Sequence, residues 1–244
     1  MKITFLGTCH GVPEPNRRCS CTMVEISGRY YFVDMGMNAV DELITRGIPV
    51  AAVKGVFITH MHGDHTDGLI QFGDLIGWKF KTADPVMFLP EEAGIQALKN
   101  WYKMADTGRW DMHFEVVHSG VIFDDGFLKV TAIPTQHCPN SYAYLLEGEG
   151  KAVLFTGDLR HPDGDFPPVA WEIETELLVC EGAHFPPTDY ASVFSKCRTK
   201  KVVINHMGAW SVPYIQQLAK DMPELPIVMA NDGMEVTVYR TEKT

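Results

Sequence analysis

The sequence predicts an α/β fold in which sheets are covered by helices. Short apolar runs rich in β-branched residues recur along the 244 residues and are separated by Gly, Pro, Asn and Asp. Segments of helical composition lie between these runs in both halves, a mixture typical of layered α/β proteins. No low-complexity segment, charge block or Pro-rich linker divides the chain. We therefore expect one domain over residues 1–244.

The first half contains five expected strands and two expected helices. The strands lie at Lys2–Leu6, Met23–Ile26, Tyr30–Val33, Val53–Ile58 and Val86–Leu89. Ser27-Gly28-Arg29 separates the second from the third, which predicts a hairpin. The helices are expected at Ala39–Arg46 and at Glu91–Met104, where the second begins with acidic residues.

The second half repeats this mixture of strands and helices. Its expected strands lie at Leu128–Ile133, Tyr142–Leu146, Ala152–Phe155, Leu177–Cys180, Val202–Ile204 and Ile227–Met229. A helix is expected at Val212–Lys220, between the last two strands. Each half thus has a strand group followed by strand–loop–helix units.

Composition and charge limit the classes of partner. Apolar residues make up 45% and charged residues 21% of the chain, as in ordinary globular proteins. The formal net charge is −10, which disfavours binding to long phosphate backbones. No apolar run is long enough to cross a bilayer, and the N-terminus enters a strand pattern without a signal-peptide h-region. We expect a cytoplasmic protein with no membrane partner, whose six cysteines are free thiols.

Four apolar strands run directly into segments that contain His or Asp, residue types that commonly bind metals. The segments that follow them are Thr59–His65, Pro134–His137, Thr156–Asp158 and Asn205–His206. In open α/β folds, ligand-binding groups collect at the carboxyl ends of strands. Four such strand ends therefore indicate one shared pocket.

The run His60-Met61-His62-Gly63-Asp64-His65 is the densest of these signals. A lone His at a strand end is usually a hydrogen-bonding loop residue, but three imidazoles and a carboxylate this close together indicate a metal site. In a tight turn, His60 and His62 can face one side while Asp64 and His65 face another, which favours two ions. His137 and His206 then add one nitrogen to each ion, and Asp158 can bridge them.

These residues resemble the metallo-β-lactamase superfamily. Thr59–His65, Asp34, His137, Asp158 and His206 match all of its ordered motifs. The resemblance covers nearly the whole chain, and it implies a four-layer αββα sandwich. The details look most like the ribonuclease Z and small phosphodiesterase branch. The flanking segments that look like this branch are less specific, and they are Leu6–Pro13, Phe155–Arg160, Cys180–Phe185 and Asn231–Met234.

The resemblance implies a role for each ligand. One ion would be held by His60, His62 and His137, the other by Asp64, His65 and His206, and Asp158 would be shared. Asp34 would orient a ligand His rather than bind metal; the alternative is a turn-forming Asp before Gly36. Zinc suits this donor set best, although manganese and iron accept the same atoms.

The reaction that we expect is hydrolysis of a small or cyclic phosphodiester by a hydroxide that bridges the two ions. Asp64 would help to orient the hydroxide, and His184, with Glu181 behind it, would protonate the leaving oxygen. Arg160 would hold a substrate phosphate. The alternatives are a solvated loop residue for His184 and a surface ion pair for Arg160.

Other functions remain open at this point. A glyoxalase-like ester, thioester or lactone hydrolase shares much of the metal set, whereas a lactamase generally lacks a bridging Asp. A non-enzymatic module would usually have lost a ligand. The tRNA-processing enzymes of the branch carry a long arm between the third and fourth ligand motifs. Here His137 and Asp158 are only 21 residues apart, which makes tRNA maturation the weaker expectation. A homodimer is common in the superfamily.

Three cysteines near the N-terminus are a further candidate metal site. Cys19-Ser20-Cys21 is similar to part of a structural zinc site in some cyclic phosphodiesterases of the superfamily. Val24 stands where the next cysteine is expected. Cys9 or His10 could complete such a cluster. The alternative is that these are small buried thiols.

Overall fold

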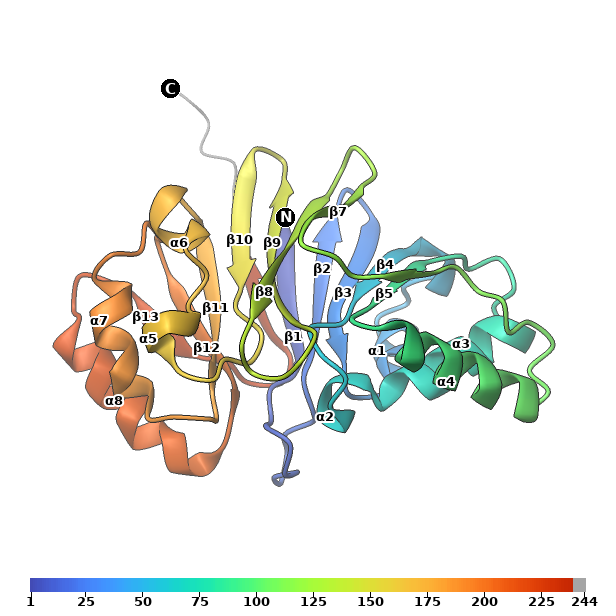
Figure 1. Ribbon diagram of the computed structural model, residues 1–244, viewed down its shortest axis with the longest axis horizontal. Coiled ribbons are helices and arrows are strands. Elements are labelled where there is room, and N and C mark those ends of the chain that lie inside the picture. The colour runs from blue at the N-terminus through green and yellow to red at the C-terminus, as the bar shows by residue number, and fades with distance from the viewer. Residues whose placement is uncertain (239–244) are drawn as a thin grey trace.

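Two sheets pack face to face, and helices cover both outer faces (Figure 1). The computed structural model describes residues 1–238. Each sheet has seven strands. The first half of the chain forms β1 to β6 of one sheet, and the second half forms β7 to β13 of the other, while β14 returns to the first sheet. The four-layer αββα arrangement expected from the resemblance is confirmed.

The first sheet has the order β14-β1-β2-β3-β4-β5-β6. Its strands are β1 (Lys2–Gly7), β2 (Cys21–Ile26), β3 (Arg29–Met35), β4 (Val53–Phe57), β5 (Val86–Leu89), β6 (Phe114–Val116) and β14 (Met234–Thr237). The predicted hairpin is present as the antiparallel pair β2–β3, and β3, β4, β5 and β6 run parallel.

The second sheet has the order β13-β12-β11-β10-β9-β8-β7. Its strands are β7 (Gly120–Asp124), β8 (Lys129–Thr135), β9 (Ser141–Gly148), β10 (Lys151–Phe155), β11 (Leu177–Gly182), β12 (Val202–Met207) and β13 (Ile227–Met229). From β10 to β13 the strands run parallel, so their carboxyl ends meet at one edge.

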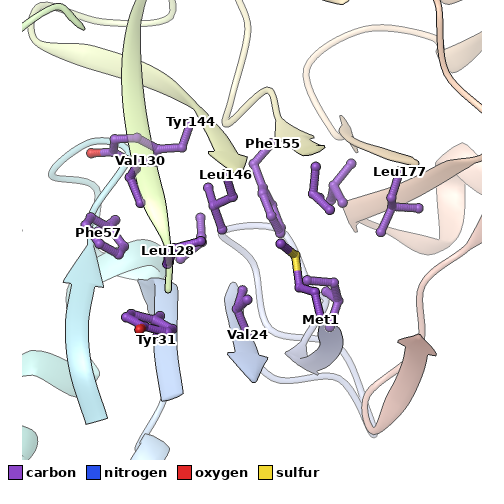
Figure 2. Packing of buried hydrophobic residues seen from close by; sticks show 14 of the residues in the cluster. Met1, Val24, Tyr31, Phe57, Leu128, Val130, Tyr144, Leu146, Phe155 and Leu177 are labelled. Carbon is purple, nitrogen blue, oxygen red and sulfur yellow. The ribbon is translucent and has the colours of Figure 1, made fainter. Parts of the chain in front are cut away.

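The main core lies between the two sheets (Figure 2). Val24 and Phe57 face it from the first sheet, and Leu146 and Phe155 face it from the second. A further core lies between the first sheet and its helices, and another lies between the second sheet and its helices. Burial of apolar area at about 25 cal/mol per Å² is the main force that holds such layers together.

Helices α1, α3 and α4 cover the first sheet, and α5 to α8 cover the second (Figure 1). They span α1 (Ala39–Thr45), α2 (Gly63–Thr66), α3 (Gly68–Trp78), α4 (Glu92–Met104), α5 (Pro162–Asp165), α6 (Val169–Glu172), α7 (Ala191–Phe194) and α8 (Val212–Asp221). Asn38 caps α1 by accepting a hydrogen bond from the Val40 backbone N–H. No helix within residues 1–238 combines the length and the apolar character needed to cross a membrane.

Several elements were not predicted from the sequence. The most important is α3, which begins just after the histidine cluster and contains three glycines that normally disfavour a helix. Gly73 is needed there because a Cβ would lie 2.2 Å from Tyr102 Oη of α4. That phenol donates a hydrogen bond to the Leu69 carbonyl, which ties the two helices together.

Candidate metal centre

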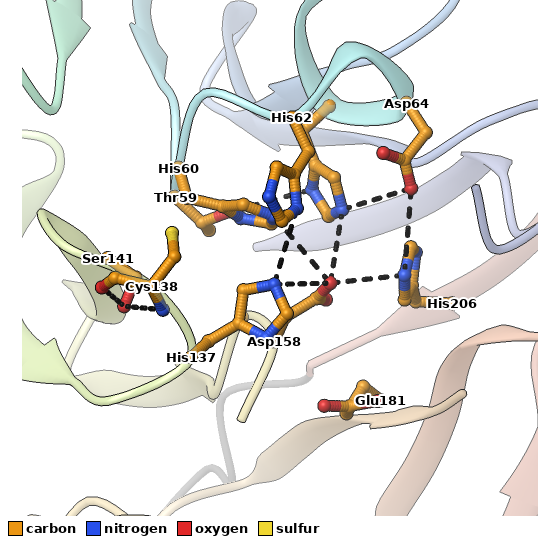
Figure 3. Close-up of polar contacts among 12 residues, drawn as sticks. Thr59, His60, His62, Asp64, His137, Cys138, Ser141, Asp158, Glu181 and His206 are labelled. Atoms are coloured by element: carbon orange, nitrogen blue, oxygen red, sulfur yellow. Dashed lines mark hydrogen bonds and ion pairs between the residues drawn. The ribbon is translucent and has the colours of Figure 1, made fainter. Parts of the chain in front are cut away.

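The site lies where the carboxyl ends of strands from both sheets meet (Figure 3). The first sheet supplies the loop after β4, with His60 and His62, and the short helix α2, with Asp64 and His65. The second sheet supplies His137 after β8, Asp158 after β10, and His206 within β12. All seven side chains that the sequence suggested as metal ligands therefore lie at one edge.

These side chains form two triads. His60, His62 and His137 have ligand atoms within 4.8 Å of one another. The second triad consists of Asp64, His65 and His206, whose ligand atoms also lie within 4.8 Å of one another. The turn after β4 separates His60 and His62 from Asp64 and His65, which is the division that the residue spacing suggested.

Asp158 lies between the triads, and it is 3% exposed. Its Oδ2 atom lies 3.7 Å from His60 Nε2 and 3.5 Å from His65 Nε2. The same oxygen lies 3.8 Å from His137 Nε2 and 3.2 Å from His206 Nε2 (Figure 3). One carboxylate thus faces imidazoles of both triads, as a bridging ligand requires.

The electrostatics keep His60 and His137 neutral and the carboxylates of Asp64 and Asp158 ionised. Burial lowers the pKa of His60 to about 2 and that of His137 to about 4. Burial alone would raise the pKa of Asp158, but His206 and His65 outweigh it and hold that pKa well below its usual range. The pKa of Asp64 is likewise lowered to about 2, because His65 outweighs the effect of burial. Neutral imidazoles and ionised carboxylates are the forms that bind metal.

Asp34 holds the histidine loop in place. Its Oδ1 accepts hydrogen bonds from the Thr59 backbone N–H at 2.8 Å and from Thr59 Oγ1 at 3.0 Å. Its Oδ2 lies 2.8 Å from His65 Nδ1. The His65 Nε2 atom is thereby left to face Asp64 and Asp158. Asp34 therefore lies where a residue that orients a ligand would be expected.

Asp34 and His206 reach the site through the same backbone irregularity. In the β2–β3 ladder, Cys21 pairs with Met35 and Thr22 with Val33, so Asp34 is an extra residue. In the β11–β12 ladder, Glu181 pairs with Asn205 and Gly182 with Met207, so His206 is the extra residue there. Both have positive φ, +58° and +46°, which is rare for residues other than glycine. Bulges of this type redirect a side chain.

Glu181 and His184 form a connected pair at the site. Glu181 is 2% exposed, and its Oε2 lies 2.8 Å from His184 Nδ1. Its other oxygen accepts a hydrogen bond from the Leu159 backbone N–H, next to Asp158, at 2.6 Å. The Glu181 contact is the largest cause of the raised pKa of His184. His184, whose side chain is 36% exposed, also forms a triad of possible ligands with His137 and Asp158.

Arg160 lies outside this cluster, and its residue is exposed. Among residues 1–238 its guanidinium forms no ion pair within 4.0 Å. Its backbone N–H donates to Asp165 Oδ2 at 2.7 Å. Asp165 also accepts from the Gln136 backbone N–H at 2.6 Å. Sequence reasoning missed Asp165, because nothing in Pro162-Asp163-Gly164-Asp165 distinguishes it from an ordinary turn.

The closing motif Asn231–Met234 holds a neighbouring loop rather than the ligands. Asp232 accepts hydrogen bonds from Thr8 Oγ1 at 2.7 Å and from the Arg18 backbone N–H at 2.8 Å. These contacts fix both ends of the loop at residues 8–18. Gly11 of that loop lies beside the Asp64 carboxylate. The motif thus supports the rim of the site.

The cysteines do not build a metal site in the described part of the chain. No group of three potential metal ligands found there includes a cysteine. Cys9 and Cys21 are buried, and burial raises the pKa of the Cys9 thiol. The alternative of small buried thiols is the better description of these two residues.

The residues fit divalent metal ions. Imidazole nitrogen and carboxylate oxygen are the usual donors for zinc, and manganese and iron accept them also. The fit also rests on His65 Nε2, which is buried without a hydrogen-bond partner among the described residues. A metal ion at the second triad would give this nitrogen the partner it lacks.

Comparison with known proteins agrees with this fold. Ribonuclease Z of Listeria innocua is 28% identical over 169 residues, which are 67% of this chain and 55% of that protein. The chain spans about half the length of the curated relatives that it matches. The crystal structure of human tRNase Z, short form, superposes with a TM-score of 0.75 at 19% identity, covering 98% of this chain and 100% of that one. The crystal structure of a diphosphatase from the PhnP family superposes with a TM-score of 0.71 at 19% identity, covering 98% of each chain.

The fold is that of the metallo-β-lactamase class of proteins, and its site brings together His and Asp side chains that could hold metal ions. Within that class, the model of one family matches residues 1–178, which is well over half of the chain. The chain belongs to this family, the anti-Pycsar protein Apyc1 family.

Proposed function

We propose that the chain is a phosphodiesterase that holds two divalent metal ions and cleaves a small or cyclic phosphodiester. The observation that carries this proposal is the position of Asp158 Oδ2, within 3.8 Å of imidazole nitrogens from both triads. A mononuclear site would need no buried carboxylate between two sets of histidines.

Each triad would hold one ion, and Asp158 would bind both. His60, His62 and His137 are the ligands of the first ion, and Asp64, His65 and His206 are those of the second. When bound, the two ions would lower the pKa of a water and neutralise charge on the phosphoryl oxygens. Zinc is our choice because the donors are imidazoles and carboxylates.

His184 is the proposed donor of a proton to the leaving oxygen. Glu181 accepts the Nδ1–H bond and three backbone N–H bonds, so the imidazole is held with Nε2 as its remaining proton-bearing atom. His184 Nδ1 also lies 3.8 Å from Asp158 Oδ2, which places the ring next to the proposed metal ligands. A positioned acid of this kind typically contributes about 10²–10⁴-fold to a rate. Arg160, exposed after β10, is the proposed contact for a substrate phosphate.

A second candidate is endonucleolytic cleavage of tRNA. The curated relatives named ribonuclease Z favour it more strongly than the sequence alone suggested. The short connection between His137 and Asp158, which holds only β9 and β10, and the net charge of −10 favour a small substrate. The likeness to a diphosphatase also supports a small phosphate compound.

The test is a substrate panel with zinc-loaded full-length protein. The panel contains bis(p-nitrophenyl) phosphate, the four 3′,5′-cyclic mononucleotides, a precursor tRNA, a thioester and a lactone. We expect turnover of the cyclic nucleotides, and a loss of at least about 10²-fold in Asp158→Ala, because its bridging oxygen is gone. His113→Ala, at an exposed position paired with Glu115, is the matched control and should behave as the native protein.

The leaving group separates the role of His184 from a general loss of structure. Nitrophenolate leaves without a proton, whereas the sugar oxygen of a cyclic nucleotide needs one. His184→Ala should therefore lose about 10²-fold or more on cyclic nucleotides and much less on the nitrophenyl ester. Cleavage of tRNA without turnover of any small diester would instead establish the second candidate. Turnover confined to the thioester or lactone would exclude both.

A further inference from the structure

A cavity of about 30 Å³ lies beside the second triad, between the two sheets. His65, Asp158 and His206 form part of its wall, whereas His60, His62 and His137 do not line it. The cavity is thus on the inner side of the ligands, away from the rim where substrate would enter. Its polar wall also includes the side chains of Ser20, Thr22, Thr156 and Asn205.

Two polar atoms of this wall lack a hydrogen-bond partner within residues 1–238. They are Asn205 Oδ1 and His206 Nδ1, in side chains of residues that are only 6% and 4% exposed. Buried polar atoms in folded proteins almost always have a partner, either a protein group or an ordered water. Two such atoms, in consecutive residues that line one cavity, indicate that the cavity contains the partner.

The bulge in β12 explains how both side chains reach the cavity. Successive residues of a regular strand point to opposite faces of the sheet. Val203 and Asn205 follow this alternation towards the space between the sheets, so His206 would point outward in a regular strand. The positive φ of His206 and its extra position in the ladder turn the ring back to the same side. Nε2 then faces Asp158, and Nδ1 is buried.

We propose that the cavity is an internal water site in which a water molecule links His206 Nδ1 to Asn205 Oδ1. The water accepts the Nδ1–H bond and donates to the amide oxygen. A water needs about 10–15 Å³ of such space and two to four polar partners, both of which this cavity provides.

The water gives His206 the orientation that Asp34 gives His65. A carboxylate binds Nδ1 of His65 directly, whereas among residues 1–238 no carboxylate is hydrogen-bonded to Nδ1 of His206. With Nδ1 protonated and bound to the water, Nε2 keeps its lone pair for the second ion. Asn205 is therefore a positioning residue that acts through the water. Its effect on metal binding rests on the proposed function, whereas the water site itself does not.

The first experiment is a crystal structure of the full-length protein, with and without zinc, at about 1.5 Å resolution or better. We expect a water within hydrogen-bonding distance, about 2.7–3.2 Å, of both atoms in both structures. A cavity without density, or a protein group bonded to Nδ1 in its place, overturns the proposal. Because the metal-free crystal answers the question, a failure to bind zinc would count against the proposed function alone.

The second experiment measures zinc affinity by chelator competition in two variants at one position. Asn205→Leu removes the acceptor, and we expect its affinity to fall by about tenfold or more, as for other partners of ligand histidines. Asn205→Asp retains an acceptor oxygen and should bind zinc at least as tightly as the native protein. Circular dichroism establishes that both variants fold. Native affinity in a folded Asn205→Leu, or an equal loss in both variants, overturns the positioning role.

Discussion

Asp165 connects two loops that carry proposed ligands. Its carboxylate accepts one backbone N–H next to His137 and another two residues after Asp158. The residue is 8% exposed, and burial raises the pKa of its carboxyl group. A buried carboxylate that accepts two backbone N–H groups is suited to fixing loops rather than to catalysis.

Asp165→Asn should weaken one metal site selectively. An amide offers only one acceptor, so one of the two backbone N–H groups loses its partner and the loop with His137 shifts. We expect the ion held by His60, His62 and His137 to bind about tenfold more weakly, while the other ion is retained. Stepwise zinc titration by calorimetry resolves the two sites. Asp163→Asn is the matched control, because Asp163 is exposed and its carboxylate accepts a weak 3.3 Å bond from Ser192. Equal titrations of the two variants would contradict the assignment.

Individual residues show why the sequence predicted some of the site and not the rest. The histidine cluster and Asp158 were accessible because their chemistry is dense or lies directly after an apolar strand. Asp165 and Thr59 were not, because their function arises from backbone contacts across 25 to 29 residues. A single sequence shows donors and acceptors, but it does not show which of them meet after folding.

At the scale of elements, the strands were predicted well and their irregularities were not. Alternating or continuous apolar patterns placed β5 and β13 at their observed bounds. The bulges at Asp34 and His206 leave no mark on such a pattern, yet they direct two side chains into the site. The helix α3 was missed because its glycines disfavour a helix locally, and only tertiary contacts explain them: Gly73 packs against Tyr102, and Gly68 and Gly77 pack against backbone carbonyls of other segments.

The turn after β10 depends on Gly157, which has φ of +60°. A Cβ there would lie 2.8 Å from the Tyr142 carbonyl oxygen and 3.3 Å from Thr59 Cβ. We expect Gly157→Ala to lower the free energy of unfolding by about 2–4 kcal/mol, since left-handed backbone strain and a steric clash add together. Urea unfolding of the metal-free protein measures this without a contribution from zinc.

Gly164 supplies the control for that experiment. Its φ is +87°, and a Cβ there would meet no atom within 4 Å. Gly164→Ala should therefore show only the strain, about 1–2 kcal/mol. If both substitutions cost the same, the close packing of Gly157 against Tyr142 and Thr59 is unimportant.

At the scale of the whole molecule, Asp125 joins the two sheets at the end opposite the metal centre. It lies after β7 of the second sheet and accepts a 2.7 Å bond from Tyr31 Oη of β3 in the first. It also accepts the backbone N–H bonds of Phe127 and Leu128. Burial would raise the pKa of Asp125, but these hydrogen bonds outweigh it and lower the pKa.

This lowered pKa predicts a pH dependence of stability. A carboxyl group whose folded pKa is depressed stabilises the protein fully above its unfolded pKa, about 3.9, and loses that effect as the pH falls through the folded value. Asp125→Asn should cost about 1–3 kcal/mol at pH 7. The difference from the native protein should be constant down to about pH 5 and shrink below pH 4. Urea unfolding of both metal-free proteins across this range checks it, and a difference that grows in acid would refute it.

The metal ions would join the same two sheets at the other end. His60, His62, Asp64 and His65 follow strands of the first sheet, and the remaining three ligands belong to the second. Metal that binds only the folded chain stabilises it by about 2.7 kcal/mol per site at a free concentration of 100 times Kd. For a chain of this length each kcal/mol shifts Tm by about 2–4 °C. One strong site therefore corresponds to a Tm shift of about 5–11 °C, and two sites to roughly twice that shift.

We expect EDTA to lower Tm by this amount and zinc to restore it. The double variant His137→Ala/His206→Ala, which removes one ligand from each triad, should melt near the EDTA-treated native protein and respond little to the chelator. A native Tm that EDTA leaves unchanged would mean that the two triads hold no ion between the sheets.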